Sequence, residues 1–176
     1  MGEKIITLIS QESIEKRIAE LAKQIAADYD GKNLFIICGL KGAFIFASDL
    51  MKLLPAETEI GFMGVSSYGK GMKSSAQMEL VLDLQDSIED RHVLLVEDIA
   101  DTGRSISFFK KQLAGRGYAS LKLCTLLDKP DARVVEDVLP DYIGFSIENK
   151  FVVGYGLDFA QKYRGLPYVG YLTFDD

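Results

Sequence analysis

The chain is poor in the features that mark secreted, disulfide-bonded or membrane-spanning proteins. Its two cysteines, Cys38 and Cys124, lie in apolar segments without a Cys-x-x-Cys spacing, so we expect buried, reduced thiols. No apolar run approaches the roughly 20 residues that a helix needs to cross a bilayer. The first residues lack the basic and apolar parts of a secretory signal. Together these absences predict a cytoplasmic protein with no membrane partner.

Positive charge is also scarce, because 20 Lys and Arg residues stand against 26 Asp and Glu residues, a formal net charge of −6. A broad nucleic-acid surface needs clustered basic side chains, so we expect no nucleic-acid partner. A small polyanion could still bind where a metal, a helix terminus and a few basic residues meet. The single histidine, His92, has no second metal-type ligand at a useful spacing and is interpreted as structural.

Proline- or glycine-rich linkers and internal repeats are missing, and 176 residues suit one α/β domain. Apolar spacing predicts a helix after a Ser10 N-cap, and two further helices follow glycine-containing turns near Gly42 and Gly103. Each of those two turns follows a short apolar run that is typical of a strand buried in a parallel sheet. The extended segments that we expect are 34–38, 60–65, 78–84, 93–96, 121–127, 142–147, 151–155 and 168–172.

A polar, glycine-containing connection, residues 66–77, joins two of these extended segments. It is longer than a tight hairpin requires, and loops of this length are often lids over a site. A plain hairpin tip fits the sequence pattern equally well. Tyr68 would favour the lid if it covered a ligand.

The most informative segment runs from Val93 to Ser105, where an apolar run is followed by the carboxylates Glu97, Asp98 and Asp101. Ligands of parallel sheets gather at the carboxyl ends of strands. Carboxylates bind sugar hydroxyls and Mg²⁺, and a small turn at a helix start offers backbone N–H groups to a phosphate. A solvated acidic strand end and a helix-capping Asp101 are the plainer alternatives. The spacing fits neither a nucleoside triphosphate loop nor a dinucleotide fingerprint.

The segment Val93 to Ser105 resembles the phosphoribosyl pyrophosphate signature of the type I phosphoribosyltransferases. Further segments narrow the resemblance to the hypoxanthine-guanine phosphoribosyltransferases and extend it over residues 34–172. These segments are Leu40-Lys41-Gly42, Ser67-Tyr68, Asp128-Lys129-Pro130, Lys150 to Asp158, and Tyr163-Arg164. The family's fold is an α/β fold with a central, mostly parallel β-sheet flanked by helices. The resemblance implies this fold in a single domain, residues 1–176, with a mobile lid loop and a small hood formed by the N-terminal segment and residues 142–176.

The resemblance implies a purine-salvage reaction that moves the 5-phosphoribosyl group from phosphoribosyl pyrophosphate to N9 of hypoxanthine or guanine. Asp101 would be the catalytic base. Mg²⁺ would be the cofactor, with Glu97 and Asp98 holding a first ion and Asp158 a second. The substrate-binding residues that the resemblance implies are Leu40, Lys41, Gly42, Ser67, Tyr68, Asp98, Ile99, Asp101, Thr102, Gly103, Arg104, Ser105, Lys129, Phe151, Val152 and Arg164.

Individual roles follow from the same resemblance. Lys129 would donate to the purine O6, Phe151 would stack on the base, and the Val152 backbone would read its edge. Lys41, after a cis peptide bond at Leu40, and Arg164 would lie beside the pyrophosphate. Related enzymes form homodimers or homotetramers. A regulator that binds phosphoribosyl pyrophosphate without catalysis is the alternative function, and an orotate or adenine transferase is disfavoured by Lys129 and the Lys150 to Asp158 segment.

Overall fold

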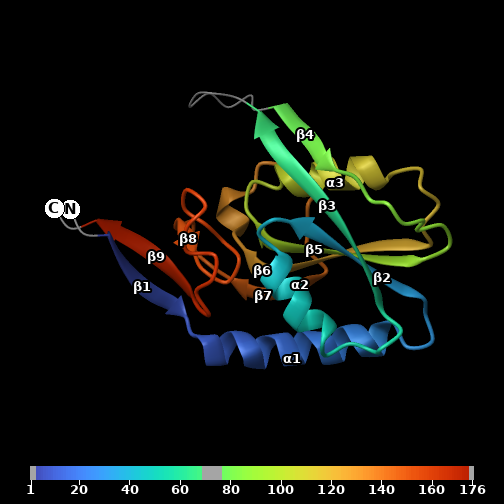
Figure 1. Ribbon diagram of the computed structural model, residues 1–176, viewed down its shortest axis with the longest axis horizontal. Helices are drawn as coiled ribbons and strands as arrows, with labels where there is room; N and C mark the ends of the chain where they lie inside the picture. Colours follow the sequence, from blue (N-terminus) through green and yellow to red (C-terminus); the bar gives the residue numbers. More distant parts are fainter. Residues whose placement is uncertain (1–2, 69–76, 175–176) are drawn as a thin grey trace.

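The computed structural model describes residues 3–68 and 77–174, which form a six-stranded sheet and a separate three-stranded sheet (Figure 1). The larger sheet has the strand order β4-β3-β2-β5-β6-β7, and the smaller one has the order β1-β9-β8. The elements are β1 (Glu3–Ile9), α1 (Gln11–Asp28), β2 (Leu34–Leu40), α2 (Phe44–Met51), β3 (Glu59–Tyr68), β4 (Gln77–Leu82), β5 (His92–Ala100), α3 (Arg104–Leu113), β6 (Ser120–Asp128), a 3-10 helix (Pro130–Ala132), β7 (Tyr142–Ser146), β8 (Val152–Val153) and β9 (Val169–Phe174).

The larger sheet is parallel except at one edge. Strands β3, β2, β5, β6 and β7 pair in parallel, and only β4 runs antiparallel to its neighbour β3. The expected mostly parallel sheet is therefore confirmed. Because parallel strands end at the same edge, the loops after β2, β5 and β6 meet there.

The Val93–Val96 part of strand β5 is an uninterrupted apolar run, and both of its faces are buried. Leu94 and Val96 face the core layer under α1 and α2, whereas Val93 and Leu95 face the layer under α3. The sheet therefore lies between helices, as two-sided burial of a parallel strand requires. The charged residue that follows, Glu97, is carried to the carboxyl edge of the sheet.

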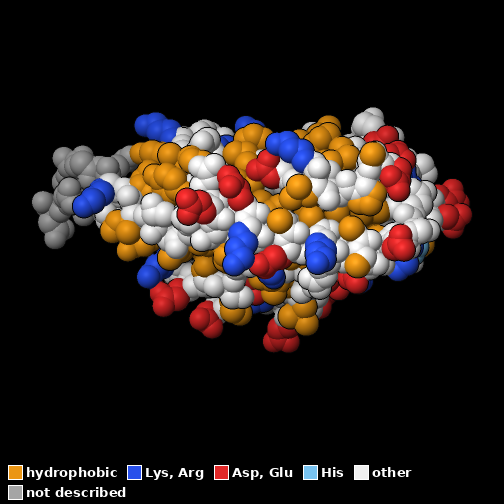
Figure 2. All heavy atoms as spheres, turned by 90° about the horizontal axis from the view of Figure 1, so that it is seen from below, with side chains coloured by type: hydrophobic (Ala, Val, Ile, Leu, Met, Phe, Trp, Pro, Cys, Tyr) orange, Lys and Arg blue, Asp and Glu red, His pale blue; other side chains and the backbone are white. Residues whose placement is uncertain are grey.

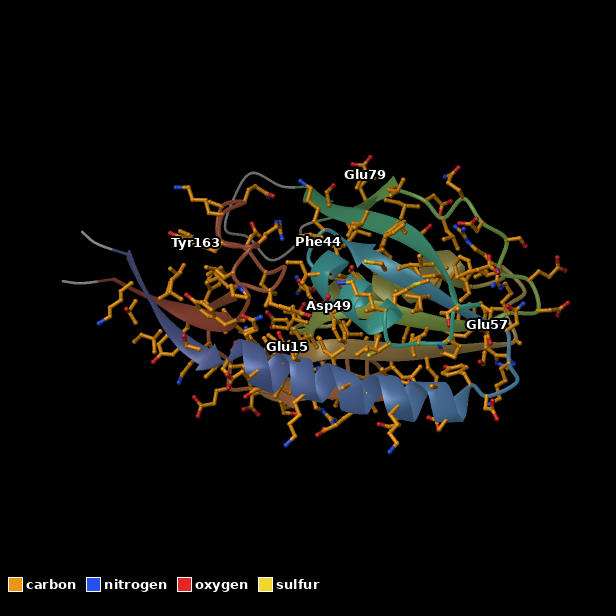
Figure 3. The ribbon with its side chains drawn as sticks, turned by 60° about the horizontal axis from the view of Figure 1, so that its bottom comes forward. Glu15, Phe44, Asp49, Glu57, Glu79 and Tyr163 are labelled. Carbon is orange, nitrogen blue, oxygen red and sulfur yellow. The ribbon has the colours of Figure 1, made fainter. Side chains whose placement is uncertain are left out.

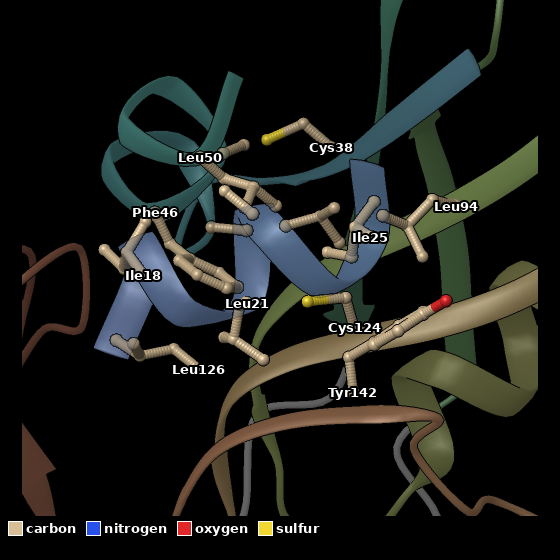
Figure 4. Close-up of a cluster of buried hydrophobic side chains, with 14 of the residues drawn as sticks. Ile18, Leu21, Ile25, Cys38, Phe46, Leu50, Leu94, Cys124, Leu126 and Tyr142 are labelled. Carbon is tan, nitrogen blue, oxygen red and sulfur yellow. The ribbon is translucent and has the colours of Figure 1, made fainter. Parts of the chain in front are cut away.

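Helix α1 begins where the sequence predicts, since the Ser13 N–H donates to the Ser10 side-chain oxygen at 3.2 Å. Its apolar stripe includes Leu21 and Ile25 and packs beside the two cysteine-bearing strands (Figure 4). Both cysteines are free and buried, which confirms the expected thiols. The Nδ1 atom of His92 lies 2.7 Å from the Ser120 hydroxyl on the neighbouring strand β6, a contact that suits the expected structural role.

The hood, defined here as the sheet β1-β9-β8, brings the two ends of the described chain together. The expected hood of residues 142–176 was partly wrong, because β7 pairs with β6 in the larger sheet. The expected strand 151–155 is also shorter than predicted. Gly154, Tyr155 and Gly156 all have positive φ values, so the chain turns directly after Val153. Strand β1 was not predicted.

The expected lid, residues 66–77, is shortened at both ends by strand pairing. Ser66, Ser67 and Tyr68 continue β3 and pair with Glu79, Met78 and Gln77 of β4. Residues 69–76, and the side chains of Ser67 and Tyr68, lie outside the described part of the chain. A lid over the site therefore stays a prediction.

Within the described ranges, none of the helices combines the length and apolar character that crossing a membrane demands. The face that carries α1 shows acidic and basic side chains interspersed among apolar ones (Figure 2). No extended patch of one sign is visible on that face.

Candidate active site

The end of β2 and the loop that follows it lie directly against Glu97 and Asp98. A Cβ atom added to Gly39 would lie 1.6 Å from Oε1 of Glu97, and one added to Gly42 would lie 1.8 Å from Oδ2 of Asp98. Both approaches are far shorter than any contact between real atoms, so a side chain at either position would displace the neighbouring carboxylate. The peptide bond between Leu40 and Lys41 is cis, as expected, and the side chain of Lys41 is exposed at this edge.

The carboxyl groups of Glu97 and Asp98 are held in an environment that disfavours their charged forms. Burial, with the neighbouring Asp98 adding to it, raises the pKa of Glu97 well above its usual range. Burial also raises the pKa of Asp98 to about 6, although the Ile99 N–H donates to it at 2.8 Å and Arg164 opposes the shift. This pair is therefore built to receive a cation or a hydrogen-bond donor.

One observation supports a metal site at Glu97 and Asp98. Oε1 of Glu97 is buried and has no hydrogen-bond partner among the described residues, so a ligand atom would complete it. In the described ranges no three His, Cys, Asp or Glu side chains are grouped as a ready cage. Mg²⁺ suits such a site because it keeps several waters and uses one or two carboxylates together with substrate phosphates.

Arg164 and Asp158 form an ion pair beside these carboxylates. Their closest N–O distance is 2.9 Å, and a second guanidinium nitrogen of Arg164 donates to the Gly156 carbonyl at 2.7 Å. Gly156 is in turn packed against the loop after β2, since an added Cβ would lie 2.0 Å from the Gly42 carbonyl oxygen. The turn after β8 is thereby fixed to the same edge of the sheet as Asp98.

Residues 101–103 form the turn between β5 and α3, and together with residues 104–105 at the start of α3 and the acidic pair they line a cavity of about 110 Å³. Gly103 has φ +85°, a backbone conformation that L side chains rarely adopt. The Thr102 carbonyl accepts the N–H groups of Val134 and Val135, both at 3.0 Å. With that carbonyl turned toward residues 134–135, the start of α3 can present backbone N–H groups and the side chains of 102–105 to an anion.

Lys129 is buried and faces Asp101. Strands β5 and β6 are in register at Ala100 and Asp128, so the next residue of each strand meets the other. The Lys129 ammonium lies 3.7 Å from the Asp101 carboxylate, with the lysine side chain 6 % exposed and the aspartate side chain 46 % exposed. A buried cation therefore stands beside an accessible carboxylate at the mouth of the turn.

Phe151 and Val152 open the hood segment that follows β7. Phe151 is 59 % exposed and makes an edge-to-face contact with Phe159, with ring centroids 5.8 Å apart. Val152 is buried and pairs with Tyr171 of β9. An exposed aromatic ring next to an anchored strand is suited to stacking on a planar ligand.

A larger cavity, about 330 Å³, lies near the other end of the molecule, where Tyr29, Pro55 and Glu57 are among its lining residues. In Figure 3, Glu57 lies toward the right of the molecule, and Tyr163 lies toward the left, on the side of the hood. The expected site residues are absent from its described lining. The smaller cavity beside Asp98 and Asp101 is therefore the candidate active site.

Comparison with known proteins agrees with this geometry. A family model described as the phosphoribosyl transferase domain matches residues 7–160. The chain belongs to this phosphoribosyltransferase family. It is 46 % identical over 165 residues to the hypoxanthine-guanine phosphoribosyltransferase of Lactococcus lactis, which covers 94 % of this chain and 89 % of that relative. A crystal structure of a Bacillus anthracis hypoxanthine-guanine phosphoribosyltransferase superposes with a TM-score of 0.89 at 39 % identity, over 98 % of this chain and 100 % of that one.

Another relative of this phosphoribosyltransferase is much longer. The bifunctional protein TilS/HprT of Listeria monocytogenes is 46 % identical over 165 residues, which are 94 % of this chain. The chain spans only 25 % of the length of that relative.

Sequence reasoning missed Arg133, whose guanidinium joins two parts of the phosphoribosyltransferase site. It donates to the carbonyl oxygens of Ala100 and Asp101 at 3.2 and 3.0 Å, and it also contacts the Val138 carbonyl and the Asp128 carboxylate. The available signal was a charged pair five residues apart immediately after a buried strand. Such a pair is common on surfaces, so the sequence alone does not single it out.

Proposed function

We propose that this chain is a hypoxanthine-guanine phosphoribosyltransferase that forms IMP or GMP and pyrophosphate. The observation that carries the proposal is the buried Lys129 ammonium 3.7 Å from Asp101, beside the turn of residues 101–105. A buried cation requires an acceptor, and the O6 oxygen of a 6-oxopurine supplies one. Adenine presents an amino group there, which would leave two donors facing each other.

The donor substrate would lie along the carboxyl end of β5. The 5′-phosphate would accept hydrogen bonds from the turn Thr102 to Ser105, with Ile99 beside it. The ribose hydroxyls would donate to Glu97 and Asp98, whose pKa values are raised by burial and which gain from a donor or cation. A first Mg²⁺ held by Glu97 and Asp98, and a second held by Asp158, would supply charge neutralisation to the leaving pyrophosphate.

Asp101 would act as the catalytic base. As N9 of the purine bonds to C1 of the ribose, the C1 bond to pyrophosphate breaks and the purine must lose the proton on N7. The accessible carboxylate of Asp101 would accept that proton, work typically worth about 10²–10⁴-fold in rate. Lys129, 3.7 Å away, holds this carboxylate on the purine side of the turn.

The remaining residues would orient the substrates and exclude water. Lys41 and Arg164 flank the loop after β2 and would bind the pyrophosphate, with Leu40 and Gly42 allowing its close approach. Phe151 would stack on the purine, and the Val152 backbone would read its edge. Ser67 and Tyr68 would close over the site with the lid.

The proposal is tested by incubating the protein with Mg²⁺, phosphoribosyl pyrophosphate and one of hypoxanthine, guanine, xanthine or adenine. Nucleotide product is expected with hypoxanthine and guanine and not with adenine. Binding of phosphoribosyl pyrophosphate with no product from any oxopurine would support the regulator instead. Calorimetry on the same samples separates the two outcomes.

Self-association and a cytoplasmic location belong to the same proposal. Exposed apolar side chains on β3 and β4, including Phe62 and Val81, would be covered by a second copy in a homodimer or homotetramer. Sedimentation velocity measures that state. The free, buried Cys38 and Cys124 suit a reducing compartment.

A further inference from the structure

The segment 128–135 contacts the proposed catalytic turn through its main chain and through one buried side chain. The Lys129 N–H donates to the Ala100 carbonyl at 2.9 Å, and the N–H groups of Val134 and Val135 donate to the Thr102 carbonyl. The carbonyl between them belongs to Asp101, and the Arg133 Nε donates to it at 3.0 Å. Three successive carbonyls of the turn are thus turned away from the ligand side.

Arg133 is shaped for this role in a way that another cation is not. Its side chain is 10 % exposed, and its planar fork contacts three carbonyl oxygens and the Asp128 carboxylate at once. The ion pair with Asp128 sets the plane of the guanidinium, because that carboxylate ends β6 and is itself buried. A lysine would keep the charge and lose the simultaneous contacts.

We infer that Arg133 is a positioning residue for the transfer reaction, acting on the proton-transfer step by fixing the Asp101 peptide. The inference rests on the proposed function and extends it to a side chain outside the substrate contacts. Holding the Asp101 carbonyl restrains the position of its Cα atom, and with it the point and direction from which the side chain leaves the main chain. A displacement of about 1 Å at a proton-accepting group can cost on the order of 10²-fold in rate.

Replacing Arg133 with lysine should change kcat and KM to different extents. The Thr102 carbonyl is held by the N–H groups of Val134 and Val135, so the phosphate-binding part of the turn keeps its anchors in an Arg133→Lys variant. We therefore expect kcat with hypoxanthine to fall by about 10- to 100-fold, while KM for phosphoribosyl pyrophosphate changes by less than about threefold.

A double-mutant cycle with Asp101→Asn tests whether Arg133 acts through Asp101. Once the base is gone its orientation no longer matters, so Arg133→Lys is expected to lower the residual kcat by less than about threefold in that background. An equal fold loss in both backgrounds would overturn the inference and assign Arg133 to general stability. A wild-type protein that forms no nucleotide would instead overturn the proposed function.

Arg17 provides a matched control. It also donates to two backbone carbonyls, Ile143 at 2.8 Å and Gly144 at 2.9 Å, and neither carbonyl belongs to the active-site turn. Arg17→Lys should lower the melting temperature and leave kcat unchanged. If Arg133→Lys fails to fold, Asp128→Asn enters the same cycle, because it keeps the guanidinium and removes the charge that orients it. Additive losses in that second cycle would also overturn the inference.

Discussion

The Lys129 ammonium stands 3.7 Å from the Asp101 carboxylate across two adjacent parallel strands. At this separation the two groups attract each other and still leave room for a ligand atom to bond to each. The buried cation cannot be satisfied by water alone, whereas the aspartate is accessible. Under the proposed function this asymmetry would divide the work of the pair: Lys129 would select the purine and Asp101 would accept its proton.

Replacing Lys129 with glutamine should therefore weaken binding of the purine and relax the discrimination against adenine. We expect KM for hypoxanthine to rise by about 10- to 100-fold, since a hydrogen bond to a charged donor is lost, with a smaller change in KM for phosphoribosyl pyrophosphate. Steady-state kinetics with hypoxanthine and adenine measure both effects. Lys32→Gln, which removes a contact to the Asp28 carbonyl remote from the turn, serves as the control and should leave both KM values unchanged.

Gly42 should tolerate no side chain if its closeness to Asp98 serves the donor substrate. An alanine Cβ would lie 1.8 Å from the Asp98 carboxylate oxygen, so that oxygen must move. We expect Gly42→Ala to weaken Mg²⁺-dependent binding of phosphoribosyl pyrophosphate by about 10²-fold or more. Calorimetry measures the affinity. Gly165→Ala places its methyl group in open space and should bind normally. Wild-type affinity in Gly42→Ala would contradict the placement of Asp98.

Much of the fold could be predicted because its signals are local. Residues close together in sequence predict the apolar stripe and the Ser10 cap of α1. They also predict that β5 is buried on both faces. The meeting of Lys129 with Asp101 also follows once β5 and β6 are adjacent parallel strands. Local periodicity and the rule that ligands gather at strand ends are enough for this part of the site.

The remaining features depend on contacts between residues distant in sequence. In the described part of the chain, strand β1 pairs with β9, which is far away in sequence, and the apolar residues of β1 do not alternate in a way that predicts a strand. The resemblance places residues 142–176 in the hood, and the short apolar pattern of β7 does not reveal that its partner is β6. Arg133 gains its meaning from the carbonyls that it contacts, and no sequence pattern shows where a carbonyl points.

Tyr155 links the turn after β8 to α2, and its removal should affect substrate binding as well as stability. Its hydroxyl donates to the Asp49 carboxylate at 2.5 Å. The backbone of Tyr155, next to Gly156, has φ +51°. Tyr155→Phe should cost about 1.5–3 kcal/mol in the free energy of unfolding and weaken phosphoribosyl pyrophosphate binding several-fold. Tyr142→Phe loses a similar bond, to Asp28 at 2.6 Å, outside the hood. It should lower stability comparably without changing affinity, and equal effects of both variants on affinity would contradict the link.

The buried acidic pair should make the ligand-free protein less stable as the pH rises. Burial raises the pKa of Glu97 well above its usual range and that of Asp98 to about 6, so the folded state binds these protons more tightly than the unfolded chain does. This contribution to stability is complete below the unfolded pKa values, near 4, and is lost as the pH rises through 6 and beyond.

Glu97→Gln cannot ionise and should escape this loss. Without Mg²⁺ or substrate, we expect its free energy of unfolding relative to wild type to increase by about 1–3 kcal/mol between pH 4.5 and pH 8, while nucleotide formation falls. Urea unfolding at the two pH values measures the change. A difference between Glu97→Gln and wild type that is independent of pH would mean that the carboxyl of Glu97 ionises as freely in the fold as in the unfolded chain.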